Sequence, residues 1–161
     1  MTPVIREATR EDAPLLAAVI RDSFRDVASR FDLTPHNCPT HPSNCVPEWI
    51  ASAFANGVRY FILERSGEPV GCVALERAGP VICRLERLAV LPKHRRHGFG
   101  DALVRHVLHE ARRMGAATVE LAIIADHSEL KAWYEQRGFA VTGSQRFDHL
   151  PFEVAFMQTR V

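Results

Sequence analysis

The chain has 161 residues, of which 47% are hydrophobic and 24% are charged. This length supports one well-formed core and is too short for two ordinary domains, so we expect a single domain over residues 1–161. Lysine and arginine total 20 against 19 acidic residues, and the net charge of +1 gives no electrostatic case for a nucleic-acid or membrane partner.

Residues 1–7 lack the basic and apolar regions of a signal peptide. No apolar run reaches the roughly 18 residues that a membrane span needs, so we expect a cytoplasmic protein. Four cysteines are few for this length, and in a reducing compartment we expect thiols and no structural disulfide. They are Cys38, Cys45, Cys72 and Cys83.

The first third of the chain predicts two helices joined by a loop. Thr9 and the acids after it resemble a helix cap, and apolar residues at helical spacing predict a helix over about residues 10–30. Residues 32–47 contain four prolines and are expected to form a loop. A short helix over 49–55 is predicted to end at Gly57.

Three strand-like runs follow, at 60–64, 69–76 and 81–91, and their short connections predict an antiparallel meander. A helix over 98–114 and a nearly continuous apolar strand over 118–124, buried on both faces, predict a parallel crossover. A helix over 128–137 and strands at 139–142 and 152–159 complete the chain. The last strand is a candidate for pairing across a homodimer.

A pair of glycines, Gly98 and Gly100, lies where a strand and its following loop lead into a helix. The free N–H groups and the dipole of the first helical turn bind phosphate oxygens, and glycine lets a ligand approach the main chain. Lys93, Arg95 and Arg96 add cations, which favours a nucleotide-like cofactor. Glycines at helix starts also serve tight packing, so the context must decide. The P-loop and Rossmann patterns are absent.

Residues 84–139 resemble the core of the GNAT N-acetyltransferase superfamily. Residues 88–92 resemble its fourth strand, Arg95-x-x-Gly98-x-Gly100 resembles its signature turn, and 132–139 resemble its late helix, which contains a tyrosine and ends in Gly-Phe. The order of elements also matches, so the resemblance extends over the whole chain. It implies an α/β (mixed α+β) fold: a mixed sheet of about seven strands, splayed between strands 4 and 5 and flanked by about four helices.

The resemblance also implies acetyl-CoA as co-substrate, and no metal is expected. Its pantetheine arm would meet backbone groups of Leu88, Ala89 and Val90 in the splay. Its pyrophosphate would lie on the signature turn, formed by Arg95, Arg96, His97, Gly98, Phe99, Gly100 and Asp101. Many relatives have asparagine seven residues before the helix tyrosine. This chain has His127 there, which either donates a hydrogen bond to the arm or is a surface residue at a helix start.

Acetyl transfer from a thioester needs a neutral amine, a donor to the carbonyl oxygen and a proton for the thiolate. Tyr134 matches the family's tyrosine, and a phenol with a reference pKa of about 10 stays protonated, so it is a candidate acid or else only packs. A backbone N–H near residues 88–90 is expected to polarise the carbonyl. Glu86 is a candidate base, or else belongs with Arg84 and Arg87 to a solvated or ion-paired strand surface.

These features predict an N-acetyltransferase that moves the acetyl group from acetyl-CoA to a primary amine by direct attack in a ternary complex. A non-catalytic acyl-CoA sensor is the alternative, because it needs the cofactor site and none of the chemistry. The acceptor, a small molecule or a protein amine, is not identified by any motif in the sequence.

The loop over 32–47 carries His36, Cys38, His41 and Cys45, which are the ligand types of a structural zinc site. Prolines after both inner candidates restrict the backbone, and four ligands in ten residues make a cramped chelate. In the resembled family this connection borders the acceptor pocket. We therefore favour a loop that shapes the substrate site, with His36 or His41 as an alternative base.

Overall fold

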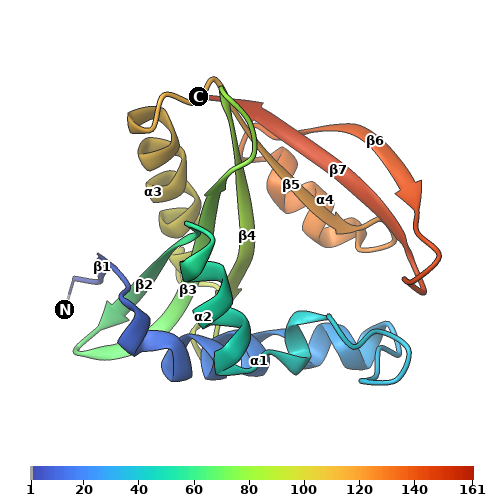
Figure 1. The fold of residues 1–161 in the computed structure, drawn as a ribbon, viewed down its shortest axis with the longest axis horizontal. Coiled ribbons are helices and arrows are strands. Elements are labelled where there is room, and N and C mark those ends of the chain that lie inside the picture. The colour runs from blue at the N-terminus through green and yellow to red at the C-terminus, as the bar shows by residue number, and fades with distance from the viewer. Residues whose placement is uncertain (1) are drawn as a thin grey trace.

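The computed structural model describes residues 2–161, which form a seven-stranded sheet covered by helices on both faces (Figure 1). The strands are β1 (Val4–Glu7), β2 (Arg59–Arg65), β3 (Glu68–Arg77), β4 (Ile82–Val90), β5 (Thr118–Ile124), β6 (Ala140–Arg146) and β7 (Glu153–Arg160). The helices are α1 (Ala13–Arg30), α2 (Pro47–Ala55), α3 (Phe99–Arg113) and α4 (Ser128–Glu135).

The strand order is β1-β2-β3-β4-β5-β7-β6. Strands β1 to β4 pair antiparallel, which confirms the predicted meander from β2 to β4. Strands β4 and β5 pair parallel across α3, as the strand–helix–strand order predicted. Strand β7 then pairs antiparallel with β5 on one edge and with β6 on the other.

The sheet is splayed between β4 and β5. These strands pair only over residues 82–84 and 118–120, and the remaining residues of both make no ladder with each other. Strand β3 holds β4 along its length and β7 holds β5, so the two halves of the sheet diverge after three paired residues. Figure 1 shows the strands meeting near the C-terminus and separating toward α1. The splay implied by the family resemblance is therefore confirmed.

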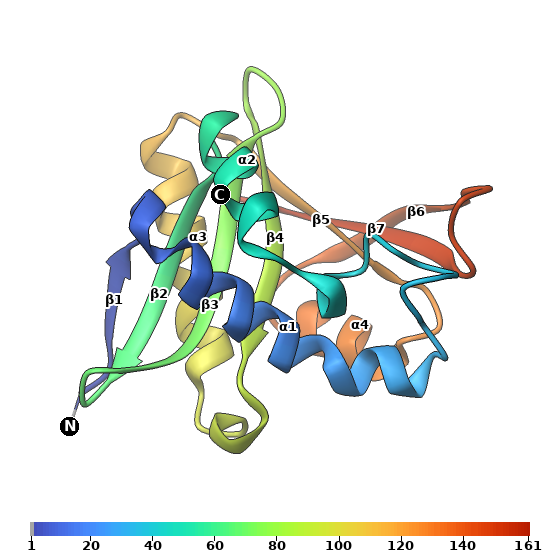
Figure 2. The ribbon, with the colours of Figure 1, turned by 60° about the horizontal axis from the view of Figure 1, so that its bottom comes forward.

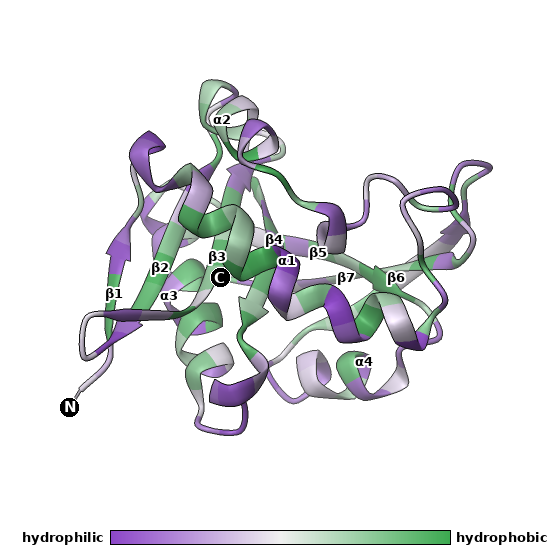
Figure 3. Ribbon diagram, turned by 90° about the horizontal axis from the view of Figure 1, so that it is seen from below, coloured by the Kyte–Doolittle hydropathy of each residue, from purple (hydrophilic) through white to green (hydrophobic). Residues whose placement is uncertain are grey.

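Two hydrophobic cores lie on opposite faces of the sheet. Helices α1 and α2 cover one face and α3 covers the other (Figure 2). The buried Tyr134 of α4 belongs to the core on the α3 side. Strands β2 and β3 run between the cores as largely hydrophobic segments (Figure 3). Burial of each large apolar side chain contributes roughly 1.5–3 kcal/mol. Fully buried members include Leu63, Leu75, Leu103 and Met157 on the α3 side, and Leu16, Ile20, Ile50 and Ile62 on the α1 side.

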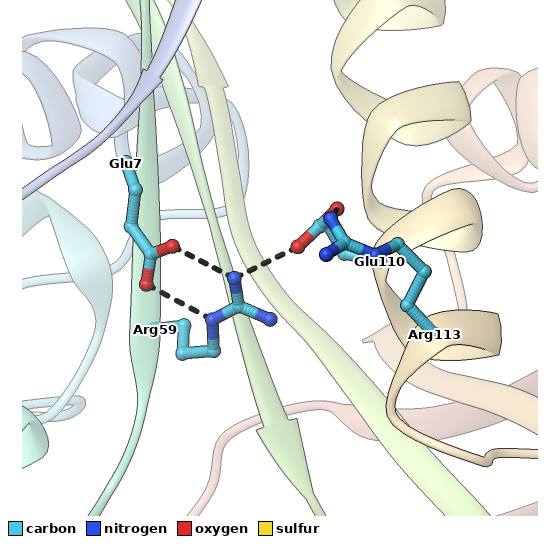
Figure 4. Close-up of polar contacts among 4 residues, drawn as sticks. All are labelled: Glu7, Arg59, Glu110 and Arg113. Carbon is cyan, nitrogen blue, oxygen red and sulfur yellow. Dashed lines mark hydrogen bonds and ion pairs between the residues drawn. The ribbon is translucent and has the colours of Figure 1, made fainter.

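An ion-pair network around the buried carboxyl of Glu110 links the β1–β2 edge of the sheet to α3 (Figure 4). Arg59 donates to Glu7 at 2.7 and 2.9 Å and to Glu110 at 2.8 Å, and Arg113 donates to Glu110 at 3.0 Å. Burial disfavours the charge of Glu110, but the two arginines outweigh it and lower the pKa of that carboxyl. The network lies at the far side of β4 from the splay.

Several element boundaries differ from the predicted ones. Helix α2 begins at Pro47, two residues early, because proline suits the first helical position. Strand β6 runs to Arg146, four residues beyond the predicted end, since its ladder with β7 continues. At the start of the first helix, the Thr9 N–H donates to Asp12 at 2.9 Å, as the cap predicted. The sequence pattern gave no range for β1.

Two expectations are corrected. The C-terminal strand has no free edge for pairing across a dimer, because β5 and β6 occupy both of its edges; β6 is the edge strand. Strand β5 is not buried on both faces, because Ala122 is exposed on the face that α1 leaves open beyond the splay. Within residues 2–161, no helix is long and apolar enough to cross a membrane.

Candidate active site

The turn between β4 and α3 leaves the helix start free for a ligand. Arg96 and Gly98 have left-handed backbones, with φ of 66° and 79°, and α3 begins at Phe99. Gly98 is the N-cap and has no side chain to bond the N–H groups of the first turn. A helix of 15 residues therefore presents unpaired donors and its positive dipole end at this turn.

Gly100 has a role in helix packing. A Cβ at this position would lie 3.1 Å from Cζ2 of Trp133, so the glycine lets α4 approach α3 closely. Asp101 pairs with Arg105 at 3.0 Å and with Arg137 at 3.3 Å, and the Arg137 guanidinium lies 3.8 Å from the Trp133 ring centre. The side chain of Asp101 is thus held by cations, and only its backbone N–H is left to face a ligand.

The side chain of Arg95 does not join the turn's cations, contrary to the sequence-based expectation. Its guanidinium donates to Asp26 at 2.6 Å, to the Ser23 carbonyl at 2.6 Å and to the Val90 carbonyl at 3.1 Å. These bonds anchor the turn to α1. Burial disfavours ionisation of Asp26, but Arg95 outweighs it and lowers the pKa of that carboxyl. Lys93 and Arg96 are exposed beside the turn.

A depression of about 400 Å³ adjoins the turn, and Arg65 and Arg105 both line it. His97 and Gly98 form the side next to the helix start, whereas the ring of Phe99 is only 6% exposed and belongs to the core. Two further guanidinium groups suit a ligand with several phosphate charges. Neither Arg65 nor Arg105 was predicted from the sequence as a site residue. Arg65 comes from the β2–β3 hairpin and carries no local signal.

Strand β4 contains a β-bulge at the level of the splay. Cys72 lies opposite Ala89, but Ala74 lies opposite Glu86, so β4 has an extra residue in this interval. Arg87 adopts a left-handed φ of 51° there. Leu88 and Val90 pack toward the α3 core and Ala89 toward the α1 core. Because β5 has already diverged, the edge of β4 along residues 88–90 has no ladder partner in β5.

Glu86 lies on the α1-facing side of β4 among other charged groups. Arg84 pairs with Glu76 at 3.1 Å and with Glu120 at 2.8 Å, but its distance to Glu86 is 3.9 Å. Burial first, and then the nearby Glu76, raise the pKa of Glu86 to about 7, while Arg84 and Arg87 oppose the shift. A carboxyl with this pKa accepts protons at neutral pH, as a general base must.

Tyr134 is 5% exposed on α4 and packs edge-on against Trp133 and Phe139, with ring centres 5.0 and 5.5 Å away. Burial raises the pKa of its phenol above the ordinary value, and Arg137 only partly opposes this, so the group stays protonated at neutral pH. It belongs to the core on the α3 side. Tyr134 and Glu86 thus lie on opposite faces of the sheet beside the splayed strands.

His127 caps α4. Its Nδ1 accepts from the Leu130 N–H at 3.4 Å, and its ring lies 5.6 Å from that of Phe31. Burial and the nearby Arg30 lower the pKa of the imidazole, so the ring is neutral and Nε2 carries its proton. Arg30 also pairs with Glu129, with one contact of 2.9 Å, and joins the end of α1 to the start of α4.

The loop over 32–47 is ordered by its own hydrogen bonds. His41 is 7% exposed, with Nδ1 2.7 Å from the Ser43 hydroxyl, and burial lowers the pKa of its ring. Cys38 and Cys45 are buried and unpaired, as are the other two cysteines, and burial raises the pKa of all four thiols. Residues 2–161 contain no group of three potential ligands that could hold a metal.

A second depression, of about 390 Å³, lies between this loop, α2 and β4. Its lining residues are Thr40, Glu48, Trp49, Ser52 and Arg87. The family resemblance predicted that this loop borders the acceptor pocket. The structure places Thr40 of the loop in the lining, whereas His36 and His41 are not part of it.

Comparisons with known proteins give one family. A model described as the acetyltransferase (GNAT) family matches residues 21–139. The chain is 30% identical over 141 residues to YjgM, an uncharacterized N-acetyltransferase of Escherichia coli, and the match covers 86% of this chain and 82% of that one. It is 32% identical over 93 residues to an amino-acid acetyltransferase of Pseudomonas putida, covering 55% of this chain and 20% of that one.

A third relative is the [ribosomal protein bS18]-alanine N-acetyltransferase of E. coli, 33% identical over 95 residues, with 56% of this chain and 64% of that one covered. Among solved structures, PaiA N-acetyltransferase from Thermoplasma acidophilum in complex with coenzyme A superposes over 100% of both chains, with a TM-score of 0.81 and 16% identity. The predicted fold is thereby confirmed. Together with the splayed sheet and the signature turn, these matches show that the chain belongs to the GNAT acetyltransferase family.

Proposed function

We propose that this protein is an N-acetyltransferase that transfers the acetyl group from acetyl-CoA to a primary amine by direct attack in a ternary complex. The observation that carries the proposal is Glu86, a half-buried carboxyl whose pKa is raised to about 7, beside the bulge where β4 leaves β5. A base of this strength is what deprotonation of an amine requires.

The residues present fit acetyl-CoA. The edge of β4 at Leu88, Ala89 and Val90 faces the splay and suits the amide groups of a pantetheine arm. Backbone N–H groups from Arg95 to Asp101 and the nearby cations suit a pyrophosphate. His127 has Nε2–H available as a further donor. The thioester of the bound co-substrate supplies the activated acetyl group.

Two side chains and one backbone group then have separate tasks. Glu86 accepts a proton from the acceptor amine, directly or through water, and leaves a neutral nucleophile. A backbone N–H of residues 88–90 donates to the carbonyl oxygen, where negative charge develops. Tyr134 donates its phenolic proton to the departing sulfur and forms the thiol. The proton that the nitrogen loses as the amide forms returns to the phenolate, so the one net proton released is the one that Glu86 takes up and passes to water.

Binding at the turn is tested by thermal unfolding with acetyl-CoA, because a ligand that prefers the folded state stabilises it by about 2.7 kcal/mol at 100 times its Kd. Gly98→Ala is expected to reduce this stabilisation, since it adds a methyl group where the ligand approaches. Gly115→Ala is the matched control at the other end of α3, because both glycines have left-handed φ angles and open space around them. Equal stabilisation of the two variants by acetyl-CoA would contradict binding at this turn.

A further inference from the structure

Arg87 is half-buried, yet no carboxylate lies within ion-pair distance of it among residues 2–161. Its guanidinium donates to the Tyr60 hydroxyl at 2.8 Å and lies 5.9 Å from the centre of a Trp49 ring. The other arginines without a carboxylate partner are exposed to water. Glu86 interacts electrostatically with Arg87 but forms no ion pair with it, so this half-buried guanidinium is left able to bind a ligand that supplies negative charge.

The bulge in β4 places Arg87 beside the proposed base. Glu86 lies opposite Ala74, whose side chain belongs to the α1-side core. Arg87 contacts Tyr60 and Trp49, which belong to the same side. Consecutive residues of a regular strand point to opposite faces, so only the extra residue and the left-handed φ at Arg87 bring both onto one face.

The depression of about 390 Å³ lies at this position. Arg87 lines it together with the indole of Trp49 and the hydroxyls of Thr40 and Ser52. Glu48 also lines it but is exposed and makes no ion pair with Arg87. The depression thus combines a cation without an ion pair, two hydroxyl-bearing residues and an aromatic residue, and Glu86 precedes Arg87 on the same face of β4.

We propose that the acceptor is a free amino acid, whose carboxylate binds Arg87 while its amine lies beside Glu86; this inference rests on the proposed acetyl transfer. In an α-amino acid the two groups are attached to one carbon, which matches two adjacent residues on one face of β4. A bidentate pair between guanidinium and carboxylate also orients the amine. A protein N-terminus or a polyamine has no carboxylate at this place and leaves Arg87 unpaired.

The test compares acceptors that differ only in this group. The standard L-amino acids, their primary amides and tetrapeptides with the same first residue are each assayed for thiol release from acetyl-CoA. Binding of the same compounds to the coenzyme A-saturated enzyme is measured by calorimetry. For at least one amino acid, kcat/KM is expected to exceed that of its amide by about 10-fold or more, as expected for a lost charge-assisted hydrogen bond.

Arg87→Met is expected to lower kcat/KM for that amino acid about 20-fold and to change kcat/KM for its amide less than about 3-fold. Arg87→Lys keeps the charge and should retain part of the preference. Arg112→Met, which removes an exposed arginine of α3 without an ion pair, is the matched control and should change neither value. Tyr60→Phe removes the hydroxyl that contacts Arg87 and should keep the preference for the free acid.

The proposal is overturned if the amide or the tetrapeptide reacts as well as the free amino acid, or if no free amino acid binds the coenzyme A-saturated enzyme. A different outcome identifies failure of the proposed function alone. This outcome is an amino acid that binds and whose binding Arg87→Met abolishes, while no acceptor causes thiol release. The carboxylate site at Arg87 would then be supported and acetyl transfer would be contradicted.

Discussion

Replacing Glu86 by glutamine is expected to lower kcat about 10²- to 10⁴-fold, the usual loss when a general base is removed. Glutamine keeps the size and the hydrogen-bonding capacity of the side chain but cannot accept the proton of the amine. The rate is best measured as single-turnover thiol release, because slow product release would otherwise hide the effect. A kcat equal to that of the wild type would show that another group, or solvent, takes the proton.

The pH dependence of kcat/KM provides a second test of Glu86. In the wild type, kcat/KM is expected to rise with pH through about 7, because only the ionised form of Glu86 is a base and its pKa is raised to that value. In Glu86→Gln, kcat/KM should no longer rise with pH in this range. Glu76→Gln is the matched control, because it removes one of the groups that raise the pKa of Glu86. In this variant the rise of kcat/KM should occur at lower pH, while the activity at pH 8 is kept.

The stability of Glu86→Gln shows whether this variant loses activity because the base is gone or because the protein unfolds. The folded-state pKa of Glu86 lies above the ordinary carboxyl value, so the folded state binds this proton more tightly than the unfolded state does. The resulting stabilisation is present at low pH and is lost as the pH rises to about 7. A neutral glutamine has no such loss, so Glu86→Gln should be at least as stable as the wild type above pH 7.

Replacing Tyr134 by phenylalanine is expected to lower kcat about 100-fold while the Kd for acetyl-CoA stays unchanged. The phenol stays protonated at neutral pH because burial raises its pKa, and phenylalanine keeps the edge-on contacts with Trp133 and Phe139. Tyr60→Phe is the control, since Tyr60 is the other tyrosine of the chain and also buried. Equal single-turnover rates for Tyr134→Phe and the wild type would limit Tyr134 to packing.

Local patterns were sufficient for the elements themselves. The amphipathic helix α3 and the strand β5 follow from spacing, and the short turns between β2, β3 and β4 predict their antiparallel pairing. The splay required the family resemblance, because residues on β4 and β5 carry no signal of where their pairing stops. The exposure of Ala122 could not be predicted either, because the sequence of a strand does not show which helices cover that strand.

Within the site, the sequence identified residue types more reliably than their directions. Gly98 was chosen from the spacing at the helix start, Tyr134 from the family resemblance and Glu86 from its place two residues before Leu88, and their roles stay predictions. The direction of the Arg95 side chain, toward α1, could not be predicted, because its partner Asp26 lies 69 residues away in the sequence. Arg87 was absent from the candidates, since a bulge at a non-glycine residue leaves no mark in the sequence, although it alone brings the guanidinium beside Glu86.

The central claim is that this chain transfers acetyl groups to an amine. The most direct measurement compares the amount of coenzyme A released with the amount of N-acetylated product formed. Both are followed by mass spectrometry in a reaction of the protein, acetyl-CoA and a panel of primary amines that includes the free amino acids. We expect equal amounts of both, and a sharp fall of both in Glu86→Gln. Stabilisation of the protein by acetyl-CoA with no acetylated product from any amine would contradict the claim and identify a protein that only binds the cofactor.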